Sequence, residues 1–444
     1  MIRKKLISGI LLSFVMVLMA GVSSMAYATD YDLWVGGKRV TSENASDVFD
    51  DGKVSYSHGN PGTLTLNGYS YSGKGYDYTV YNTYGAGIYT SNADLNIILK
   101  GDNSIIVSGN SAENDGVCIK GNLNIGGTGS LTTTSGADAA LSFGFYVGQK
   151  LTIDGGTVSA NGQDGIYVVN GLTINGGNIT ASGSKFGITI STNGSASING
   201  GTVIANGNGN NNGYGIHAGN GLTISGGKLS ATGNKYGISS GNNVMITGGK
   251  VSATGNEYGI KSTSPGNHVY INGGTVIAAG DQGSSSTTGN ISIEGIGWSN
   301  KEGTTGEMSI STGSGIDITM FKRVQFPKVL NPATVTVAPK ARDLTYTGSA
   351  QELVTAGTTD DGTMKYALGV NGTTAPTAYT SSIPSGTNAG IYYVWYMVDG
   401  DEWRRDSIPT CIQVTIAEAK GSYSYASGAQ SIWQKQAAGI CRSA

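Results

Sequence analysis

Leu151-Thr-Ile-Asp-Gly-Gly-Thr-Val-Ser-Ala160 is the first of six versions of one phrase, which returns as Leu172-Thr-Ile-Asn-Gly-Gly-Asn-Ile-Thr-Ala181 and closes as Val269-Tyr-Ile-Asn-Gly-Gly-Thr-Val-Ile-Ala278. The Gly-Gly pairs begin at residues 155, 176, 200, 226, 248 and 273, so successive steps are 21, 24, 26, 22 and 25 residues long. A second phrase with Gly-Ile, such as Tyr214-Gly-Ile216, lies in each gap. A step of nearly constant length indicates a solenoid.

The side-chain period inside the repeat predicts strands. Leu222 and Ile224 alternate with polar residues, and so do Leu229 and Ala231, which is the two-residue period of a strand with one buried face. No 3.6-residue apolar stripe occurs in the repeat, which excludes helices there. Gly-Gly, Gly-Asn and Asn-Gly pairs divide each step into three short strands and supply the positive φ that sharp corners need.

These features predict an all-β fold whose main part is a right-handed parallel β-helix of about ten coils over residues 63–320. Inward side chains should then stack from coil to coil as ladders. The predicted ladders are Leu151, Leu172, Ala196, Leu222, Val244 and Val269; Val158, Ile179, Val203, Leu229, Val251 and Val276; and Ala160, Ala181, Ala205, Ala231, Ala253 and Ala278.

Residues 1–28 are predicted to be a signal peptide. Arg3, Lys4 and Lys5 precede a long apolar run, and Ala26-Tyr27-Ala28 is a small-x-small cleavage site. The alternative is a retained membrane anchor. Removing these three cations changes the formal charge from -2 to -5, which does not predict nucleic-acid binding. No later stretch is apolar enough to span a bilayer, so we expect a secreted, extracellular protein, of Gram-positive style.

The composition changes along the chain and suggests the domain boundaries. Residues 29–62 should form a capping hairpin with its turn at Gly36-Gly37. After a linker at residues 321–332, residues 333–418 have the longer alternations of a small immunoglobulin-like (Ig-like) β-sandwich. The start of that module recurs at an offset of 79 residues, because Val335-Thr-Val-Ala338 matches Val414-Thr-Ile-Ala417 and residues 346–351 match residues 425–430, and the match fails after Ile432. We interpret residues 419–444 as the truncated, poorly ordered start of a second module.

Two insertions interrupt the coils. The tyrosine-rich residues 69–84 and the Asn-rich residues 206–212 are expected to be loops that leave the rod, because a solenoid tolerates additions at its corners.

Enzymes that cut acidic polysaccharides need strong cations or clustered carboxylates. Residues 53–321 contain no arginine. Asp154 and Asp164 fall in one coil, but their counterparts in the next are Asn175 and Phe186, so no carboxylate cluster is predicted. We therefore expect a protein that is not an enzyme, and keep a polysaccharide lyase or glycoside hydrolase as the alternative.

The remaining titratable groups give weaker signals. Asp115 and Glu113 are expected to be solvated at a loop, and the histidines 58, 217 and 268 are single and far apart. Calcium is a further possibility, with Asp115, Asp164 and Asp281 as oxygen ligands. No acidic spacing is repeated around these residues.

A set of aromatic residues is more informative. Phe186, Tyr214, Tyr236 and Tyr258 each precede Gly-Ile and should lie one above another along a corner. Because sugars bind to aromatic rings, these four residues are the candidate ligand-binding residues. The competing interpretation is that the rings pack on one another and stiffen the corner, worth about 0.5–1.5 kcal/mol per pair.

The chain also resembles a known combination of modules. Tyr31-Asp-Leu-Trp-Val-Gly-Gly-Lys-Arg-Val-Thr41 with Leu64-Thr-Leu-Asn-Gly68 and the Gly-Gly coils is similar to carbohydrate-binding-domain-containing β-helix proteins of Firmicutes cell surfaces. Leu344-Thr-Tyr-Thr-Gly348 and Tyr392-Tyr-Val-Trp-Tyr396 resemble the Ig-like repeat modules attached to such proteins.

This resemblance implies an exported, surface-displayed, adhesin-like protein that binds polysaccharide or host glycan, sometimes with calcium, and in which the Ig-like module is a spacer. The sequence departs from the wider pattern because it has no Leu-Pro-x-Thr-Gly sorting motif. It does not specify the glycan, a protein ligand in its place, or the oligomeric state.

Overall fold

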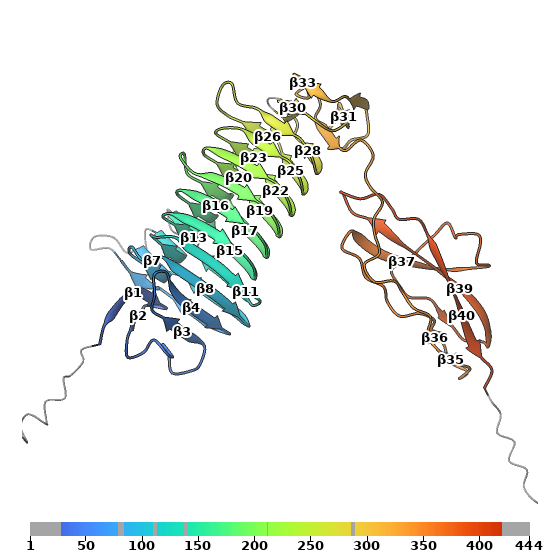
Figure 1. Cartoon of the computed structure of the whole chain (residues 1–444), viewed down its shortest axis with the longest axis horizontal. Coiled ribbons are helices and arrows are strands. Elements are labelled where there is room, and N and C mark those ends of the chain that lie inside the picture. The colour runs from blue at the N-terminus through green and yellow to red at the C-terminus, as the bar shows by residue number, and fades with distance from the viewer. Residues whose placement is uncertain are drawn as a thin grey trace, which may run out of the picture. The chain divides into compact units, whose positions relative to one another are not determined.

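The computed structural model describes residues 28–78, 84–109, 113–136, 141–210, 212–285 and 289–419 (Figure 1). The chain divides into two compact units, Met1–Val329 and Leu330–Ala444. The predicted signal peptide and the predicted incomplete module lie outside the described residues, apart from Ala28 and Ala419.

The first unit is a parallel β-helix, as predicted. One strand of every coil lies in a 12-stranded sheet, in which β4 to β30 follow one another in parallel. Its strands are β3 (Val54–Ser57), β4 (Gly62–Asn67), β8 (Leu95–Lys100), β11 (Leu123–Gly127), β14 (Lys150–Ile153), β16 (Gly171–Ile174), β18 (Ser195–Ile198), β21 (Gly221–Ile224), β24 (Val244–Ile246), β27 (Val269–Ile271), β30 (Asn290–Ile291) and β33 (Gly313–Ser314).

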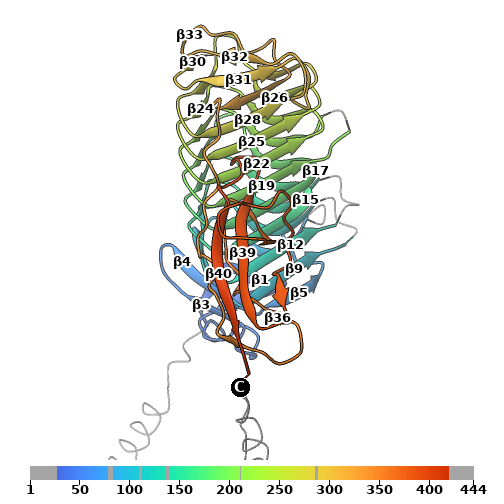
Figure 2. The ribbon, with the colours of Figure 1, turned by 90° about the vertical axis from the view of Figure 1, so that its right-hand side faces the viewer.

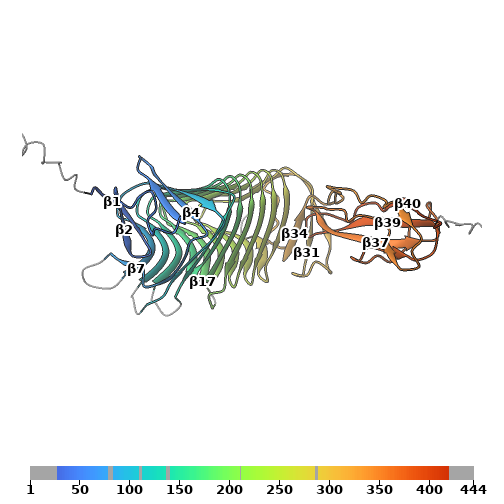
Figure 3. The ribbon, with the colours of Figure 1, turned by 90° about the horizontal axis from the view of Figure 1, so that it is seen from below.

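The other two strands of each coil lie in a 22-stranded sheet. Their stacking from coil to coil is visible in Figure 3. They are β7 (Tyr84–Thr90), β9 (Asp102–Val107), β10 (Glu113–Ile119), β12 (Ser130–Ser135), β13 (Leu141–Val147), β15 (Thr157–Val168), β17 (Asn178–Ile190), β19 (Thr202–Gly207), β20 (Tyr214–Ala218), β22 (Lys228–Gly233), β23 (Tyr236–Ser240), β25 (Lys250–Gly255), β26 (Tyr258–Ser262), β28 (Thr275–Ala279) and β29 (Gly283–Ser285). In β15 and β17 the two strands run on as one. The handedness and the number of coils stay predictions.

The three predicted ladders form the core. In the first, Leu151, Leu172, Ala196, Leu222, Val244 and Val269 are in register from strand to strand, and each is at most 5% exposed. Burial of each large aliphatic side chain contributes about 1.5–3 kcal/mol. The alternation seen in the sequence therefore identifies the inward face correctly.

Glycine shapes the coil at two places. The second glycine of each of the six Gly-Gly pairs has φ between +74° and +83°, a region that side chains disfavour. The glycine of the Gly-Ile phrase is needed for a different reason. A β-carbon added to Gly187 would lie 2.6 Å from the Asn206 nitrogen and 2.9 Å from the Ala205 carbonyl carbon. The glycine thus lets two walls of one coil touch backbone to backbone.

Both ends of the β-helix are covered. The predicted hairpin is present as β1 (Asp30–Val35) and β2 (Lys38–Thr41), and β1 pairs antiparallel with β7. At the other end β34 (Arg323–Phe326) pairs antiparallel with β28 and with β31 (Gly295–Trp298). β31 also pairs antiparallel with β32 (Met308–Ile310), and Figure 2 shows these two strands at this end. The first unit therefore continues into the residues predicted as a linker, and its edge strands are paired.

The expectation that the tyrosine-rich insertion leaves the rod is wrong for residues 69–78. β5 (Ser70–Gly73) pairs in parallel with β9, and β6 (Tyr76–Asp77) pairs antiparallel with β7. The Tyr76 ring stacks on Trp34 with 4.4 Å between centroids, and the Tyr78 ring stacks on Tyr89 at 4.5 Å. The insertion folds back because its rings find aromatic partners on the cap and the first coil.

The second unit contains a four-stranded sheet in the order β35 (Leu344–Thr345), β40 (Thr410–Ala417), β39 (Gly390–Gly400) and β37 (Gly362–Gly369), and a pair formed by β36 (Gln351–Glu352) and β38 (Ser385–Gly386). Val394, Tyr396 and Val414 are buried in its core. On the other face of β39, the Trp395 indole donates a hydrogen bond of 3.0 Å to the Asn371 carbonyl oxygen. The second unit is thus a small β-domain, and its Ig-like character stays a prediction.

Candidate functional site

The residue before each Gly-Ile phrase belongs to one column that runs along the 22-stranded sheet. Strand pairing places the four predicted binding residues, Phe186, Tyr214, Tyr236 and Tyr258, in adjacent positions of this column. The column extends toward the cap beyond the four predicted residues. Its earlier members are Ala86, Asp115, Phe143 and Asp164.

The four predicted residues contact one another. Centroid distances are 4.9 Å for Phe186 and Tyr214, 5.0 Å for Tyr214 and Tyr236, and 6.1 Å for Tyr236 and Tyr258. The first two pairs are stacked and the third is tilted. The ring faces inside this ladder are therefore used by neighbouring rings, as the packing interpretation predicts. A ligand would meet ring edges and phenol hydroxyls.

A second column lies beside the first, three residues further along each strand. It contains Tyr89, Cys118, Tyr146, Tyr167, Thr189, His217, Ser239 and Lys261 in register. We call the rings of both columns, with those stacked on them from the cap, the aromatic strip. It consists of Trp34, Tyr76, Tyr78, Tyr89, Phe143, Tyr146, Tyr167, Phe186, Tyr214, Tyr236 and Tyr258.

Lysine ammonium groups lie against the strip. Lys120 Nζ is 4.0 Å from the Tyr146 ring centroid and 5.2 Å from that of Tyr78. Further along, an ammonium lies 4.4–5.3 Å from the nearest ring at Lys185, Lys235 and Lys261. A cation over an aromatic face is attracted by the ring quadrupole. The strip therefore presents hydroxyls, ring edges and positive charge along one side of the β-helix.

Asp115 interrupts the rings at the first of two places. The expectation that it is solvated is wrong, because it lies within β10 with no exposed surface. The Tyr78 hydroxyl donates a hydrogen bond of 3.1 Å to its Oδ2. Burial, reinforced by the charge of Glu113, raises the pKa of Asp115 to about 7, against the opposing effects of Cys118, Lys120 and Tyr78. This carboxyl therefore changes its charge near neutral pH.

Asp164 interrupts the rings at the second place, between Phe143 and Phe186. It is 4% exposed, and the Thr189 hydroxyl donates a hydrogen bond of 2.9 Å to its Oδ2. Burial raises the pKa of Asp164 to about 6, although Thr189 and Lys185 act in the opposite direction. Both buried acids thus lie in one column, one coil on either side of Phe143.

His217 lies in the second column and is largely buried. His217 Nδ1 lies 3.3 Å from the Ser239 hydroxyl, and burial lowers the pKa of His217. Ser239 is itself buried. A buried hydroxyl cannot reach a substrate, so this pair is not arranged as a nucleophile with its base.

The three predicted calcium ligands are not brought together. Asp115 and Asp164 are separated by a coil, and Asp281 forms an ion pair with Lys301 at 3.3 Å. Among the described residues, no group of three or more His, Cys, Asp or Glu side chains is placed to hold one metal ion. Calcium binding therefore stays a prediction, and the described residues contain no group of acidic side chains placed to bind the ion.

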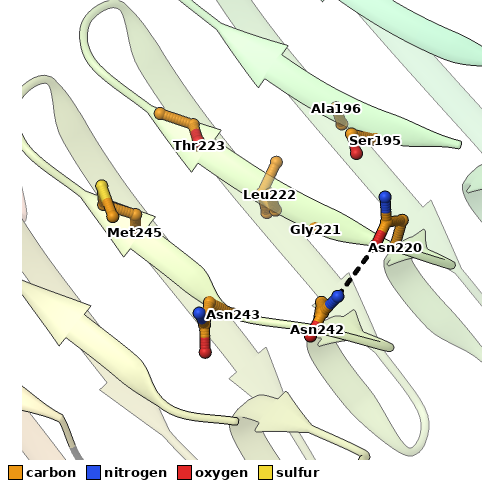
Figure 4. A pocket seen from close by; sticks show the side chains of 9 residues that line it. All are labelled: Ser195, Ala196, Asn220, Gly221, Leu222, Thr223, Asn242, Asn243 and Met245. Atoms are coloured by element: carbon orange, nitrogen blue, oxygen red, sulfur yellow. Dashed lines mark hydrogen bonds between the residues drawn. The ribbon is translucent and has the colours of Figure 1, made fainter.

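A separate hollow of about 270 Å³ lies on the 12-stranded sheet, at the starts of β18, β21 and β24 (Figure 4). Asparagine side chains line its rim, and the exposed side chain of Met245 contributes to its apolar part. The Asn242 amide donates a hydrogen bond of 2.8 Å to Asn220 Oδ1. No residue of this hollow was predicted as a site.

The sequence contained a signal for the parts of the strip that were missed. Asp115-Gly-Val117 and Phe143-Gly-Phe145 have the same form as Tyr214-Gly-Ile216. A search for glycine followed by any apolar residue, and not by isoleucine alone, would have found the same phrase in the irregular coils. The stacking of cap residues such as Trp34 on the strip had no comparable signal, because it depends on pairing between distant segments.

The comparisons agree with the architecture. Residues 172–191, 197–220 and 222–242 match the family model described as Beta helix repeat. No curated protein and no solved structure matches the chain. Within the described residues, no helix has the length and apolar character that crossing a membrane requires. The chain is thus a β-helix protein, and its function has to be argued from the site.

Proposed function

We propose that this protein is a non-catalytic polysaccharide-binding rod, exported to the cell surface or beyond, that holds a glycan chain along the aromatic strip. The observation that carries the proposal is the recurrence of ring edges, hydroxyls and ammonium groups along one side of the β-helix, with interruptions at Asp115 and Asp164. A β-helix repeats its surface at about 4.8 Å per coil. A polymer with many similar sugar units can therefore make the same contact several times.

The contact differs from sugar stacking on exposed ring faces. Because Phe186, Tyr214 and Tyr236 use their faces against one another, the glycan would lie across their edges. Tyr214 and Tyr258 remain half-buried, so their hydroxyls can exchange hydrogen bonds with sugar hydroxyls. Lys261, whose Nζ is 4.4 Å from the Tyr258 ring centroid, supplies a further donor. Each contact is weak alone, and several on one polymer add through multivalency.

The test is a glycan array followed by titration of the polysaccharide that binds best. The variant combines Tyr214→Phe, Tyr258→Phe and Lys261→Gln, which keeps the ring contacts and removes the polar groups. We expect at least a tenfold loss of affinity. Tyr270→Phe, on the other sheet, is the matched control and should bind as the wild type does. Binding to a protein receptor with no glycan bound would overturn the proposal.

A lyase or glycoside hydrolase acting on acidic polysaccharide is the second candidate. The observation in its favour is the pair of buried acids, Asp115 and Asp164, with pKa values of about 7 and about 6, since perturbed carboxyls gather at active sites. Against it, Asp115 is fully buried and Asp164 nearly so. Assays for reducing ends and unsaturated products on pectins and glycosaminoglycans decide between the two. Turnover that Asp164→Asn abolishes would favour the enzyme.

A further inference from the structure

We propose that the hollow on the 12-stranded sheet is a second binding site, which takes one neutral pyranose residue. It lies between β18 and β24, on the sheet that does not carry the aromatic strip (Figure 4). Its volume of about 270 Å³ is slightly below the range of 300–1,000 Å³ that is usual for drug-sized ligands. This size suits a single sugar ring.

The hollow lies where an outward-facing column of the sheet carries small residues. This column adjoins the inward ladder of Leu172, Ala196 and Leu222. In the outward-facing column the register runs from Lys150 through Gly171 and Ser195 to Gly221. A β-carbon added to Gly221 would have its nearest neighbour at 3.6 Å, so there is room above this glycine for a ligand.

The rim is made of amides that are already oriented. Asn220 Oδ1 accepts the hydrogen bond from Asn242, and Asn243 Oδ1 accepts one of 2.9 Å from the His268 backbone nitrogen. Among the described residues, no further hydrogen bond engages the Nδ2 atoms of Asn220 and Asn243. Two amide donors held by their own carbonyl oxygens are suited to bind sugar hydroxyls, because little side-chain entropy is lost on binding.

The apolar part and the charge select the ligand class. Met245 at the edge of the hollow is 38% exposed, so C–H groups of a sugar face can lie against its carbon and sulfur atoms. No lining side chain is charged. A carboxylate or sulfate would be desolvated there without a compensating cation, which is costly. The site therefore favours a neutral sugar over an acidic one.

Gly221→Gln is the blocking variant. The equivalent position two coils before Ser195 is Lys150, so the stack tolerates a long side chain in this column. Gly171→Gln is the matched control, because Gly171 belongs to the same column and does not line the hollow. Both variants should unfold at the same temperature as the wild type, and only Gly221→Gln should fill the hollow.

Binding is read from the methyl NMR signal of Met245 in the full chain, assigned with Met245→Leu. The probes are glucose, galactose, mannose and N-acetylglucosamine, with glucuronate as the acidic comparison. We expect a saturable shift with at least one neutral sugar, none with glucuronate, at least a tenfold weaker response in Gly221→Gln and an unchanged one in Gly171→Gln.

The inference is overturned if no neutral sugar shifts the Met245 signal, or if Gly221→Gln responds as the wild type does. The strip variants leave this hollow untouched. A protein that binds polysaccharide along the strip but shows no Met245 response therefore contradicts this inference alone. A Met245 response without polysaccharide binding contradicts the proposed function alone.

Discussion

Asp115 shows how one buried carboxyl makes the stability of this fold depend on pH. Burial and the charge of Glu113 favour the protonated form of this carboxyl, so the native state binds its proton more tightly than the unfolded chain does. Its pKa is raised from 3.8 to about 7. The protonated form therefore stabilises the fold at acidic pH. That contribution is lost as pH rises from about 4 to about 7.

Asp115→Asn should remove this pH dependence. We expect the variant to be more stable than the wild type at pH 8, by on the order of 2–4 kcal/mol, and similar to it at pH 4. Thermal unfolding at both pH values is the measurement. Asp281→Asn, in an exposed ion pair, is the control and should show little change. A destabilised Asp115→Asn at pH 8 would mean that the ionised carboxyl has a favourable partner.

Glycine positions in the Gly-Ile phrase give a second test at this scale. A methyl group at Gly187 meets backbone atoms at 2.6 Å, and backbone cannot move aside without opening the coil. Gly187→Ala should lower stability by about 1–3 kcal/mol. At Gly126 an added β-carbon meets nothing within 4 Å, so Gly126→Ala is the control. Denaturant titration separates the two, and equal midpoints would contradict the tight contact of the coil walls.

At the scale of elements, one carboxylate adds to the strand pairing and ring contacts that tie the cap to the first coil. Asp32 accepts hydrogen bonds of 2.8–2.9 Å from the Ser91 nitrogen and hydroxyl and from the nitrogens of Asn92 and Ala93. Burial alone would raise the pKa of Asp32, but these bonds lower it. The contribution of Asp32 to stability is present above its unfolded pKa and is lost as pH falls through its lower folded value.

Asp32→Asn should loosen this end of the β-helix. We expect faster hydrogen exchange at Ser91 to Ala93 and a loss of about 1–2 kcal/mol at pH 7, partly reduced by solvent screening. At pH 2 the two proteins should differ less. Asp30→Asn, which removes a surface ion pair with Arg39, is the comparison and should exchange as the wild type does. Unchanged exchange in Asp32→Asn would show that β1 docks without this carboxylate.

The elements also explain which predictions the sequence could support. Ladder residues such as Leu172 and Val203 alternate with polar residues every second position. Because this alternation is visible between neighbouring residues, their burial could be predicted from the sequence. The fold of residues 69–78 depends on Tyr76 meeting Trp34 and on Tyr78 meeting Tyr89, contacts between segments that no period connects. The same reason hid the burial of Asp115, whose neighbours Tyr78 and Phe143 come from distant parts of the sequence.

For the site, the sequence located the ladder but not its extent. The prediction of Phe186, Tyr214, Tyr236 and Tyr258 as one stack agrees with the register of β17, β20, β23 and β26. Their role in binding stays a prediction. The hollow beside Gly221 could not be predicted, because it results from the absence of side-chain volume at positions that look ordinary in the repeat.

At the scale of the whole molecule, the central claim is that a glycan chain is bound along the aromatic strip. Hydrogen–deuterium exchange of the full chain, with and without the polysaccharide selected by the array, tests this most directly because it maps protection along every strand. The account predicts slower exchange in β17, β20, β23 and β26, with the second unit unchanged. Protection confined to the second unit or to the 12-stranded sheet would contradict it.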